Sequence, residues 1–417
     1  MDKKDFIKIN QIELSNGLRL VHHYMPDTAM VTLNVLYNVG AKMENPELTG
    51  LAHLFEHLMF AGTLNVPDFD KVLSSAGGMS NAWTGNDFTN FYEIVPSHNA
   101  ETLFYLESDR MMSPAITERA LDIQRSVVIE EFKQQCLNVP YGDIMHYMRS
   151  LVYGDHPYSW PVIGKNVDQL RAITKNDIDS WWRNNYYPAN AVVSVVGNIS
   201  FENTVRYATK WFERVDKRYP EKIISDKSVP ELSERRFKEI LGPVPSTMIM
   251  VAFLMSEYGT KQYFAADAVT DILSAGQASR FYQEIVLDPK SPIVEADASI
   301  SGSEERGILM LTARLADESI DPDFATEYLI GKARSIITQG VSDYDLQRLK
   351  NKQHSMFVFS NMSSVTCAYT IAEAVMHHEK PGEKLAYYKE LTSLEIQDTA
   401  RNIFDCSQPA VIYYRPK

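Results

Sequence analysis

The stretch Gly50-Leu51-Ala52-His53-Leu54-Phe55-Glu56-His57-Leu58-Met59-Phe60 decides how the rest of this chain is interpreted. In an α-helix each residue turns by about 100°, so His53 and His57 lie about 40° apart and Glu56 lies about 60° to the other side of His53. The other residues are mostly apolar, which predicts that these three polar groups sit on a largely buried helix and need partners there. The spacing His-x-x-Glu-His is typical of a zinc site in which the histidines bind the metal and the glutamate acts as general base. Two helix histidines held by carboxylates or backbone groups would give the same pattern, and a third ligand would separate the two interpretations.

The third ligand is expected from a second helix, at residues 117–137. A catalytic zinc site keeps three protein ligands and one open position, so two histidines need one more residue. Glu130 lies on the polar face of this predicted helix. Glu131 shares its face, at the spacing i, i+3, i+4 and i+7, with Gln124, Val127 and Val128. We therefore expect Glu131, rather than Glu130, to point inward.

Composition places the chain among globular proteins with more than one domain. Its 417 residues are too many for one ordinary core, and 45% are hydrophobic while 23% are charged. A net charge of −13 argues against general nucleic-acid binding and against a basic membrane-binding surface. Three widely spaced cysteines, Cys136, Cys367 and Cys406, indicate reduced thiols rather than a disulfide framework.

The ends and the hydropathy of the chain indicate its compartment. Residues 1–10 contain neither an apolar core nor a small-residue cleavage site, so no signal peptide is predicted. No stretch reaches 18 apolar residues, so no membrane span is predicted. We expect a cytoplasmic protein.

Periodicity predicts similar orders of elements in the two halves. The first half is expected to contain a hairpin at 12–24, strands at 31–39, 80–84, 88–95 and 191–197, the histidine helix, which stops at Gly62-Thr63, and helices at 69–76, 100–112, 117–137 and 175–185. The second is expected to contain strands at 247–253, 302–315 and 410–414 and helices at 263–274, 322–338 and 343–357. This predicts two related α+β domains at 1–218 and 235–417, joined by a polar, proline-containing linker at 219–234. The helix at 263–274, the first of the later half, lacks a histidine or glutamate pair, so one metal site is expected.

The motif and its context resemble the pitrilysin/insulinase family of inverzincin metallopeptidases, M16. His53 to His57, with Glu131 after Arg125-Ser126-Val127-Val128-Ile129-Glu130, carries the resemblance most strongly. Asn81-Ala82-Trp83-Thr84, His156-Pro157-Tyr158 with Gly164, and the segment 187–198 also resemble family blocks. The chain is most similar to the half-size members, which include the mitochondrial processing peptidase subunits and bacterial M16B peptidases. The match is strong over most of the first half and covers the second half only in architecture.

The resemblance implies the LuxS/MPP-like metallohydrolase fold, with a mostly antiparallel sheet packed with helices in each domain. It also implies that His53, His57 and Glu131 hold one zinc ion per chain, and that Glu56 takes a proton from the attacking water. Asn81 and Ala82 would lie on an edge strand that pairs with an extended peptide substrate. Without the resemblance, these two residues would be read as an ordinary strand.

Two departures from the family pattern affect the expected activity. Family members usually have a glutamate seven residues before the third ligand, where it supports the ligands, whereas this chain has the neutral Gln124. An arginine and a tyrosine of the second half normally reach the substrate, but Val286 occupies the arginine's place and no tyrosine lies between Gln283 and Glu327. Arg280 is interpreted as a solvated or salt-bridged residue of the preceding helix.

Together these features predict a zinc-dependent endopeptidase that hydrolyses unfolded peptides or targeting presequences. We expect it to be the zinc-bearing subunit of a two-chain enzyme, in which a homologous M16 subunit supplies the arginine and tyrosine. A heterodimer is favoured, and a homodimer stays open. The alternatives are a non-hydrolytic structural or chaperone-like subunit of a processing-peptidase-type assembly and, less favoured, a metal-binding regulator.

Overall fold

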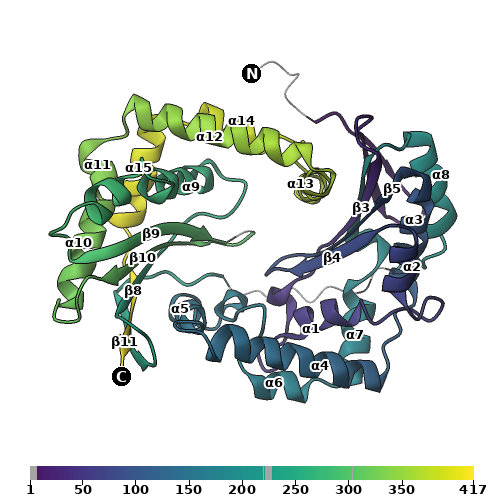
Figure 1. Cartoon of the computed structure of the whole chain (residues 1–417), viewed down its shortest axis with the longest axis horizontal. Coiled ribbons are helices and arrows are strands. Elements are labelled where there is room, and N and C mark those ends of the chain that lie inside the picture. The colour runs from purple at the N-terminus through teal and green to yellow at the C-terminus, as the bar shows by residue number, and fades with distance from the viewer. Residues whose placement is uncertain (1–6, 219, 221–227, 303) are drawn as a thin grey trace. The chain divides into compact units, whose positions relative to one another are not determined.

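The structure, a computed structural model, describes residues 7–218, 220, 228–302 and 304–417 (Figure 1). The protein is α+β and its described residues form two compact units. Unit 1 comprises residues of Met1–Phe132, Trp160–Ser225 and Met356–Lys384. Unit 2 comprises residues of Lys133–Ser159, Asp226–Ser355 and Leu385–Lys417. None of the helices in the described ranges is long and apolar enough to cross a membrane.

Unit 1 contains a six-stranded mixed sheet with β4 at one edge. Its strands run in the order β1 (Asn10–Glu13), β2 (Arg19–Tyr24), β6 (Ala191–Gly197), β3 (Met30–Tyr37), β5 (Thr89–Pro96) and β4 (Met79–Thr84). The β2–β6 pair is parallel and the other pairs are antiparallel. The strands predicted in the first half are confirmed to within about two residues, the usual scatter of element boundaries.

Unit 2 repeats this topology in five strands. They run in the order β7 (Arg236–Gly242), β11 (Ala410–Pro416), β8 (Met248–Leu254), β10 (Ile308–Leu315) and β9 (Ile293–Ser301). The β7–β11 pair is parallel and the others are antiparallel, as in the series β2-β6-β3-β5-β4 of unit 1. The prediction of two related α+β domains, each with a mostly antiparallel sheet packed with helices, is confirmed.

Helices follow the strands in a similar order in both halves. In unit 1 they are α1 (Leu51–Leu58), α2 (Phe69–Ser75), α3 (Ala100–Met112), α4 (Glu118–Phe132), α6 (Val167–Ala172), α7 (Lys175–Asn185), α8 (Phe201–Phe212) and α13 (Ser364–Met376). In unit 2 they are α5 (Ile144–Tyr153), α9 (Lys261–Ser274), α10 (Pro322–Ala333), α11 (Ser335–Gln339) and α15 (Ser393–Phe404). The chain of α12 (Asp343–Met362) and of α14 (Glu383–Glu390) passes from one unit to the other. Two π-helical turns follow Phe132 and Phe281, namely η4 (Lys133–Leu137) and η7 (Tyr282–Val286).

Each half of the chain contributes one helix to the sheet of the other half. The first half supplies α5, whose apolar residues at i, i+4 and i+8 pack on β7, β8 and β11. The second half supplies α13, which packs on β3 and β6. The predicted linear division into 1–218, 219–234 and 235–417 stays a prediction, and the compact units differ from it by these two segments. Of the predicted linker, residues 219 and 221–227 lie outside the described residues.

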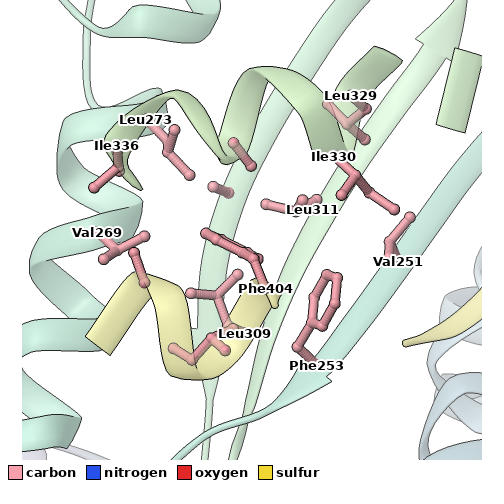
Figure 2. Close-up of a cluster of buried hydrophobic side chains, with 14 of the residues drawn as sticks. Val251, Phe253, Val269, Leu273, Leu309, Leu311, Leu329, Ile330, Ile336 and Phe404 are labelled. Atoms are coloured by element: carbon pink, nitrogen blue, oxygen red, sulfur yellow. The ribbon is translucent and has the colours of Figure 1, made fainter. Parts of the chain in front are cut away.

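The core of unit 2 lies on both faces of its sheet. Along β8, Ile249, Val251 and Phe253 point to a cluster shared with α9, α10 and α15 (Figure 2). The alternate residues Met250, Ala252 and Leu254 point to a second cluster, which contains the apolar side of α5. Because successive side chains of a strand point to opposite faces, an uninterrupted apolar run is what a strand covered on both sides requires.

Candidate metal centre

Helix α1 is held in unit 1 by its buried side and by a carboxylate at its start. Leu54 and Phe55 are fully buried, and α1 packs against α4, α7 and β4. At its N-terminus, Glu44 accepts hydrogen bonds from the backbone N–H groups of Gly50, at 3.0 Å, and Ala52, at 2.8 Å. Its oxygens satisfy N–H groups that have no partner within the helix, and burial raises the pKa of Glu44 to about 8 against the lowering effect of these hydrogen bonds.

His53, His57 and Glu131 converge, as the sequence predicted. One ligand atom from each lies within 4.8 Å of the other two. The Glu131 Oε2 atom is 3.4 Å from His57 Nε2 and 3.8 Å from His53 Nε2. Zinc ligands at about 2.1 Å in a tetrahedron lie about 3.4 Å apart, so these separations and this donor set fit zinc.

The state of His53 also suits a metal ligand. Burial, and then the charge of His57, lower the pKa of His53 to about 4, so the imidazole is neutral at neutral pH. Neutral imidazole is the form that binds metals. In the described part of the chain, the buried Nδ1 atom of His53 has no hydrogen-bond partner. The ring nitrogen that faces Glu131, and that would bind a metal, is the other one, Nε2.

Glu56 lies beside this group with its carboxylate nearly buried. Its side chain accepts a hydrogen bond from Thr84, with 2.5 Å between Thr84 Oγ1 and Glu56 Oε2. Burial raises the pKa of Glu56 to about 7, against the opposing effect of the Thr84 hydrogen bond, and the charge of Glu131 adds to the increase. A carboxyl group with this pKa can accept and return a proton near neutral pH.

Helix α4 presents Glu131 to the centre and Glu130 to solvent. Glu130 is exposed and the Glu131 side chain is 29% exposed. Gln124, two turns earlier on α4, is half-buried. The prediction that Val127 belongs to the buried part of this face is wrong, because Val127 is 46% exposed and the buried positions are Leu121, Val128, Ile129 and Phe132.

The residues predicted to bind substrate lie on the edge strand β4. Asn81 is exposed and Ala82 is half-buried, and β4 pairs with β5 alone among the described strands. The side-chain oxygen of Asn81 accepts the backbone N–H of Ala82 at 2.8 Å. The strand ends at Thr84, beside Glu56, so this edge leads to the candidate centre.

The corresponding place in unit 2 has no histidine. Helix α9 carries Asp267 and Asp271 at the i and i+4 positions, and Lys352 of α12 forms an ion pair with Asp271. Tyr388 donates a hydrogen bond to Asp267. Within the described ranges, one group of three metal-binding residues is close enough to hold an ion, and it lies in unit 1.

The segment between Arg280 and Val286 shows one expected and one unexpected feature. Arg280 is salt-bridged as predicted, 3.4 Å from Asp345, and it also donates to the carbonyl of Gly340 at 2.6 Å. It does not belong to the preceding helix, because α9 ends at Ser274. Val286 closes the π-helical turn η7 and is 37% exposed.

Sequence reasoning missed the contacts that hold the centre in place. Thr84 lies 28 residues from Glu56 along the chain, and Glu44 lies six to eight residues before the N–H groups that it accepts, across the turn that precedes α1. Thr84 was recognised only as part of a family block. Its position at the end of a strand that leads toward α1 is the signal that could have indicated a contact.

Comparisons with known proteins support the same family for both halves. The model of the insulinase family, peptidase family M16, matches residues 19–150, and that of the peptidase M16 inactive domain matches residues 172–353. The chain is 25% identical over 418 residues to the zinc protease PqqE of Helicobacter pylori, a match that covers 98% of this chain and 93% of that protein. It is 26% identical over 322 residues to the mitochondrial-processing peptidase subunit beta of Saccharomyces cerevisiae, covering 74% of this chain and 66% of that one. A solved structure of a protease from Helicobacter pylori has the same fold, with a TM-score of 0.92 at 23% identity over 99% of this chain and 100% of that chain.

Proposed function

Because the chain belongs to the M16 family of peptidases, as one of its half-size members, we propose that it is a zinc-dependent endopeptidase. Its substrates would be unfolded peptides or targeting presequences. The observation that carries this proposal is the convergence of His53, His57 and Glu131 with the carboxylate of Glu56 beside them. A cytoplasmic location stays a prediction.

In this proposal the three converging residues hold one zinc ion. When bound, zinc supplies a Lewis acid that polarises the peptide carbonyl and makes water acidic enough to lose a proton near neutral pH. His53 contributes a neutral imidazole, while Glu131 contributes negative charge. Gln124 is neutral, whereas family members usually have a glutamate at this position. The three ligands are therefore supported by one negative charge fewer, which would weaken metal binding.

Glu56 is proposed to move the proton. Its carboxylate accepts a proton from the water that attacks the peptide carbonyl, and the same group then returns it to the leaving amine. Thr84 occupies Oε2, so Oε1 is the oxygen available for this transfer. The nearly buried position of Glu56 limits competing water, which strengthens its interactions with the reacting groups.

The edge of β4 is proposed to bind the substrate as an added strand. An edge strand presents unpaired backbone groups that can pair with an extended peptide. Asn81 and Ala82 lie on this edge, two to three residues before Thr84. A peptide paired there would run along the strand that ends beside Glu56.

The second chain of the enzyme is proposed to supply two further donors. Where the family has an arginine, this chain has Val286, and no tyrosine follows before Tyr328. A donor directed at the developing oxyanion can contribute about 3 kcal/mol, or about 100-fold in rate, so their loss would leave the isolated chain weakly active. A homologous M16 subunit with the arginine and tyrosine would restore them. The mitochondrial-processing peptidase relative is itself named as a subunit.

The experiment measures peptide cleavage by the purified chain alone and together with homologous chains that carry the arginine and tyrosine. We expect low activity alone, a large increase in the mixture, and loss of that activity in Glu56→Gln with zinc retained. Full activity of the isolated chain, abolished by a change in its own second half, would refute the two-chain proposal. A zinc-loaded mixture with no cleavage of any unfolded peptide would instead favour the non-hydrolytic subunit, which the Gln124 and Val286 departures also suggest.

A further inference from the structure

The short segment 40–44 ties the end of the edge strand β4 to the start of the helix α1. The backbone N–H of Ala41 donates to the carbonyl of Gly85 at 3.0 Å, and the N–H of Lys42 donates to that of Asn86 at 2.9 Å. Gly40 sits so close to this turn that a Cβ atom would lie 2.4 Å from the Asn86 carbonyl oxygen. The turn that follows β4 is therefore fixed against this segment.

The other end of the same segment fixes the N-terminus of α1. Glu44, the last residue of the segment, accepts the N–H groups of Gly50 and Ala52 at the N-terminus of the helix. Lys42 adds an ion pair of 2.8 Å to Asp87, which is nearly inaccessible to solvent. One short stretch of chain thus holds both elements whose side chains meet at the centre.

The side chains that meet are Thr84 and Glu56. Thr84 is the last residue of β4, where it pairs with Thr89 of β5, and its hydroxyl donates to Glu56 Oε2 at 2.5 Å. A hydroxyl held by a paired strand end and a carboxylate held by a capped helix have little freedom to separate. A hydrogen bond to a charged acceptor is also stronger than one between neutral groups.

We propose that Thr84 is a positioning residue, whose hydroxyl fixes the carboxylate of Glu56 so that one oxygen, Oε1, is directed to the attacking water. This inference rests on the proposed peptidase function. Because Thr84 ends the strand that would pair with the substrate, any shift of β4 on peptide binding would pass directly to Glu56. The hydrogen bond from Thr84 to Glu56 therefore links the proposed substrate-binding edge directly to the proposed proton-transferring group.

The competing explanation is that Thr84 only stabilises unit 1. A structural role would make Thr84→Val less stable and less active in proportion to its folded fraction. A positioning role makes a different prediction, namely a folded, zinc-loaded variant with a lower kcat and an unchanged KM. The two explanations also differ for Thr84→Ser, which keeps the hydroxyl but loses the methyl group.

The experiment compares the zinc-loaded two-chain enzyme as wild type, Thr84→Val and Thr84→Ser, with Thr204→Val as the matched control. Thr204 of α8 is a buried threonine whose hydroxyl donates to the carbonyl of Ser200, so the control makes the same substitution in unit 1 away from Glu56 and from β4. We expect kcat to fall about 10- to 100-fold in Thr84→Val, the range found when a partner of a site residue is lost. KM and zinc content should not change, and Thr84→Ser and Thr204→Val should stay within about 3-fold of wild type, because the hydroxyl on Glu56 is kept. A wild-type kcat in folded Thr84→Val would overturn the inference.

A second measurement separates failure of this inference from failure of the proposed function. Crystal structures of the zinc-loaded wild type and Thr84→Val show the Glu56 carboxylate directly, whether or not any peptide is cleaved. We expect the carboxylate to keep one orientation in the wild type and to rotate or become disordered in Thr84→Val. An unchanged, ordered Glu56 in the variant would overturn the positioning role. If the wild-type enzyme cleaves no peptide, the proposed function fails, while this comparison still decides the role of Thr84.

Discussion

The charge of Glu56 should destabilise the metal-free protein, and Glu56→Gln should therefore stabilise it. Burial raises the pKa of Glu56 from an ordinary 4.5 to about 7. The folded state thus binds this proton more tightly than the unfolded state. Its contribution to stability is fully present below pH 4.5 and is lost as the pH rises toward and through 7.

The size of the effect follows from the pKa values. One pKa unit corresponds to about 1.4 kcal/mol of free energy. Relative to low pH, the free energy of unfolding of the wild type therefore falls by about 1 kcal/mol at pH 5 and by about 3 kcal/mol at pH 8. Glutamine keeps the shape and can still accept the hydrogen bond from Thr84, but it carries no charge. We therefore expect Glu56→Gln to be more stable than the wild type by up to about 3 kcal/mol at pH 8, with a much smaller difference at pH 5.

Urea unfolding of both proteins in the presence of a chelator, between pH 4.5 and 8, measures this difference. Glu47→Gln serves as the control, because Glu47 is an exposed glutamate shortly before α1. Saturating zinc should reduce the advantage of Glu56→Gln, since a nearby cation stabilises the carboxylate. Glu56→Gln should also lose peptide hydrolysis while it keeps zinc. If the difference in free energy of unfolding between Glu56→Gln and the wild type does not change with pH, burial does not disfavour the charged form of Glu56 and the reasoning is refuted.

Three further substitutions test the surroundings of the centre. Glu131→Gln should weaken zinc binding by more than about 100-fold in a competitive chelator titration, because a charged ligand is lost, whereas Glu130→Gln should leave it unchanged. Gln124→Glu should strengthen zinc binding by about 10-fold in the same titration, and weaker binding would contradict the role given to this position. Arg110→Met should lower the free energy of unfolding by about 3 kcal/mol or more, because it leaves the buried carboxylates of Glu93 and Glu107 without their cation. Arg171→Met, which removes an exposed ion pair, should change it by less than about 1 kcal/mol.

Local patterns in the sequence were sufficient to predict the elements that carry His53, His57 and Glu131. The apolar surroundings of His53 and His57 indicated a buried helix, and the period of α4 separated Glu131 from Glu130. Both inferences use neighbours within two helical turns, where periodicity determines which side chains share a face. The helix predicted at 322–338 was less accurate, because the chain breaks at Arg334 into α10 and α11.

Strands at the edges of the second sheet were not predicted. In β7 the exposed residues Phe237, Lys238 and Glu239 stand together, so no alternation of apolar and polar residues marks the strand. In β9 the exposed Val294 and Glu295 interrupt the pattern in the same way. An edge strand has less of its surface covered than a central one and therefore needs fewer apolar residues.

Long-range contacts were also outside the reach of sequence patterns. The apolar side of α5 shows that this helix is buried, but it does not show that the helix packs on the sheet formed by the second half of the chain. The contact of Thr84 with Glu56, 28 residues apart, is likewise set by the fold and not by local spacing. The residues that converge at the candidate centre could thus be predicted, while those that hold them in place could not.

The central claim is that His53, His57 and Glu131 together bind one zinc ion. The most direct test is an anomalous difference map at the zinc absorption edge, from crystals of the zinc-loaded chain. The account predicts a single strong peak bound by both imidazoles and by the Glu131 carboxylate, with Glu56 close by but not bound. A peak elsewhere in the chain, or a Glu131 carboxylate turned away from an ion held by the histidines, would contradict it.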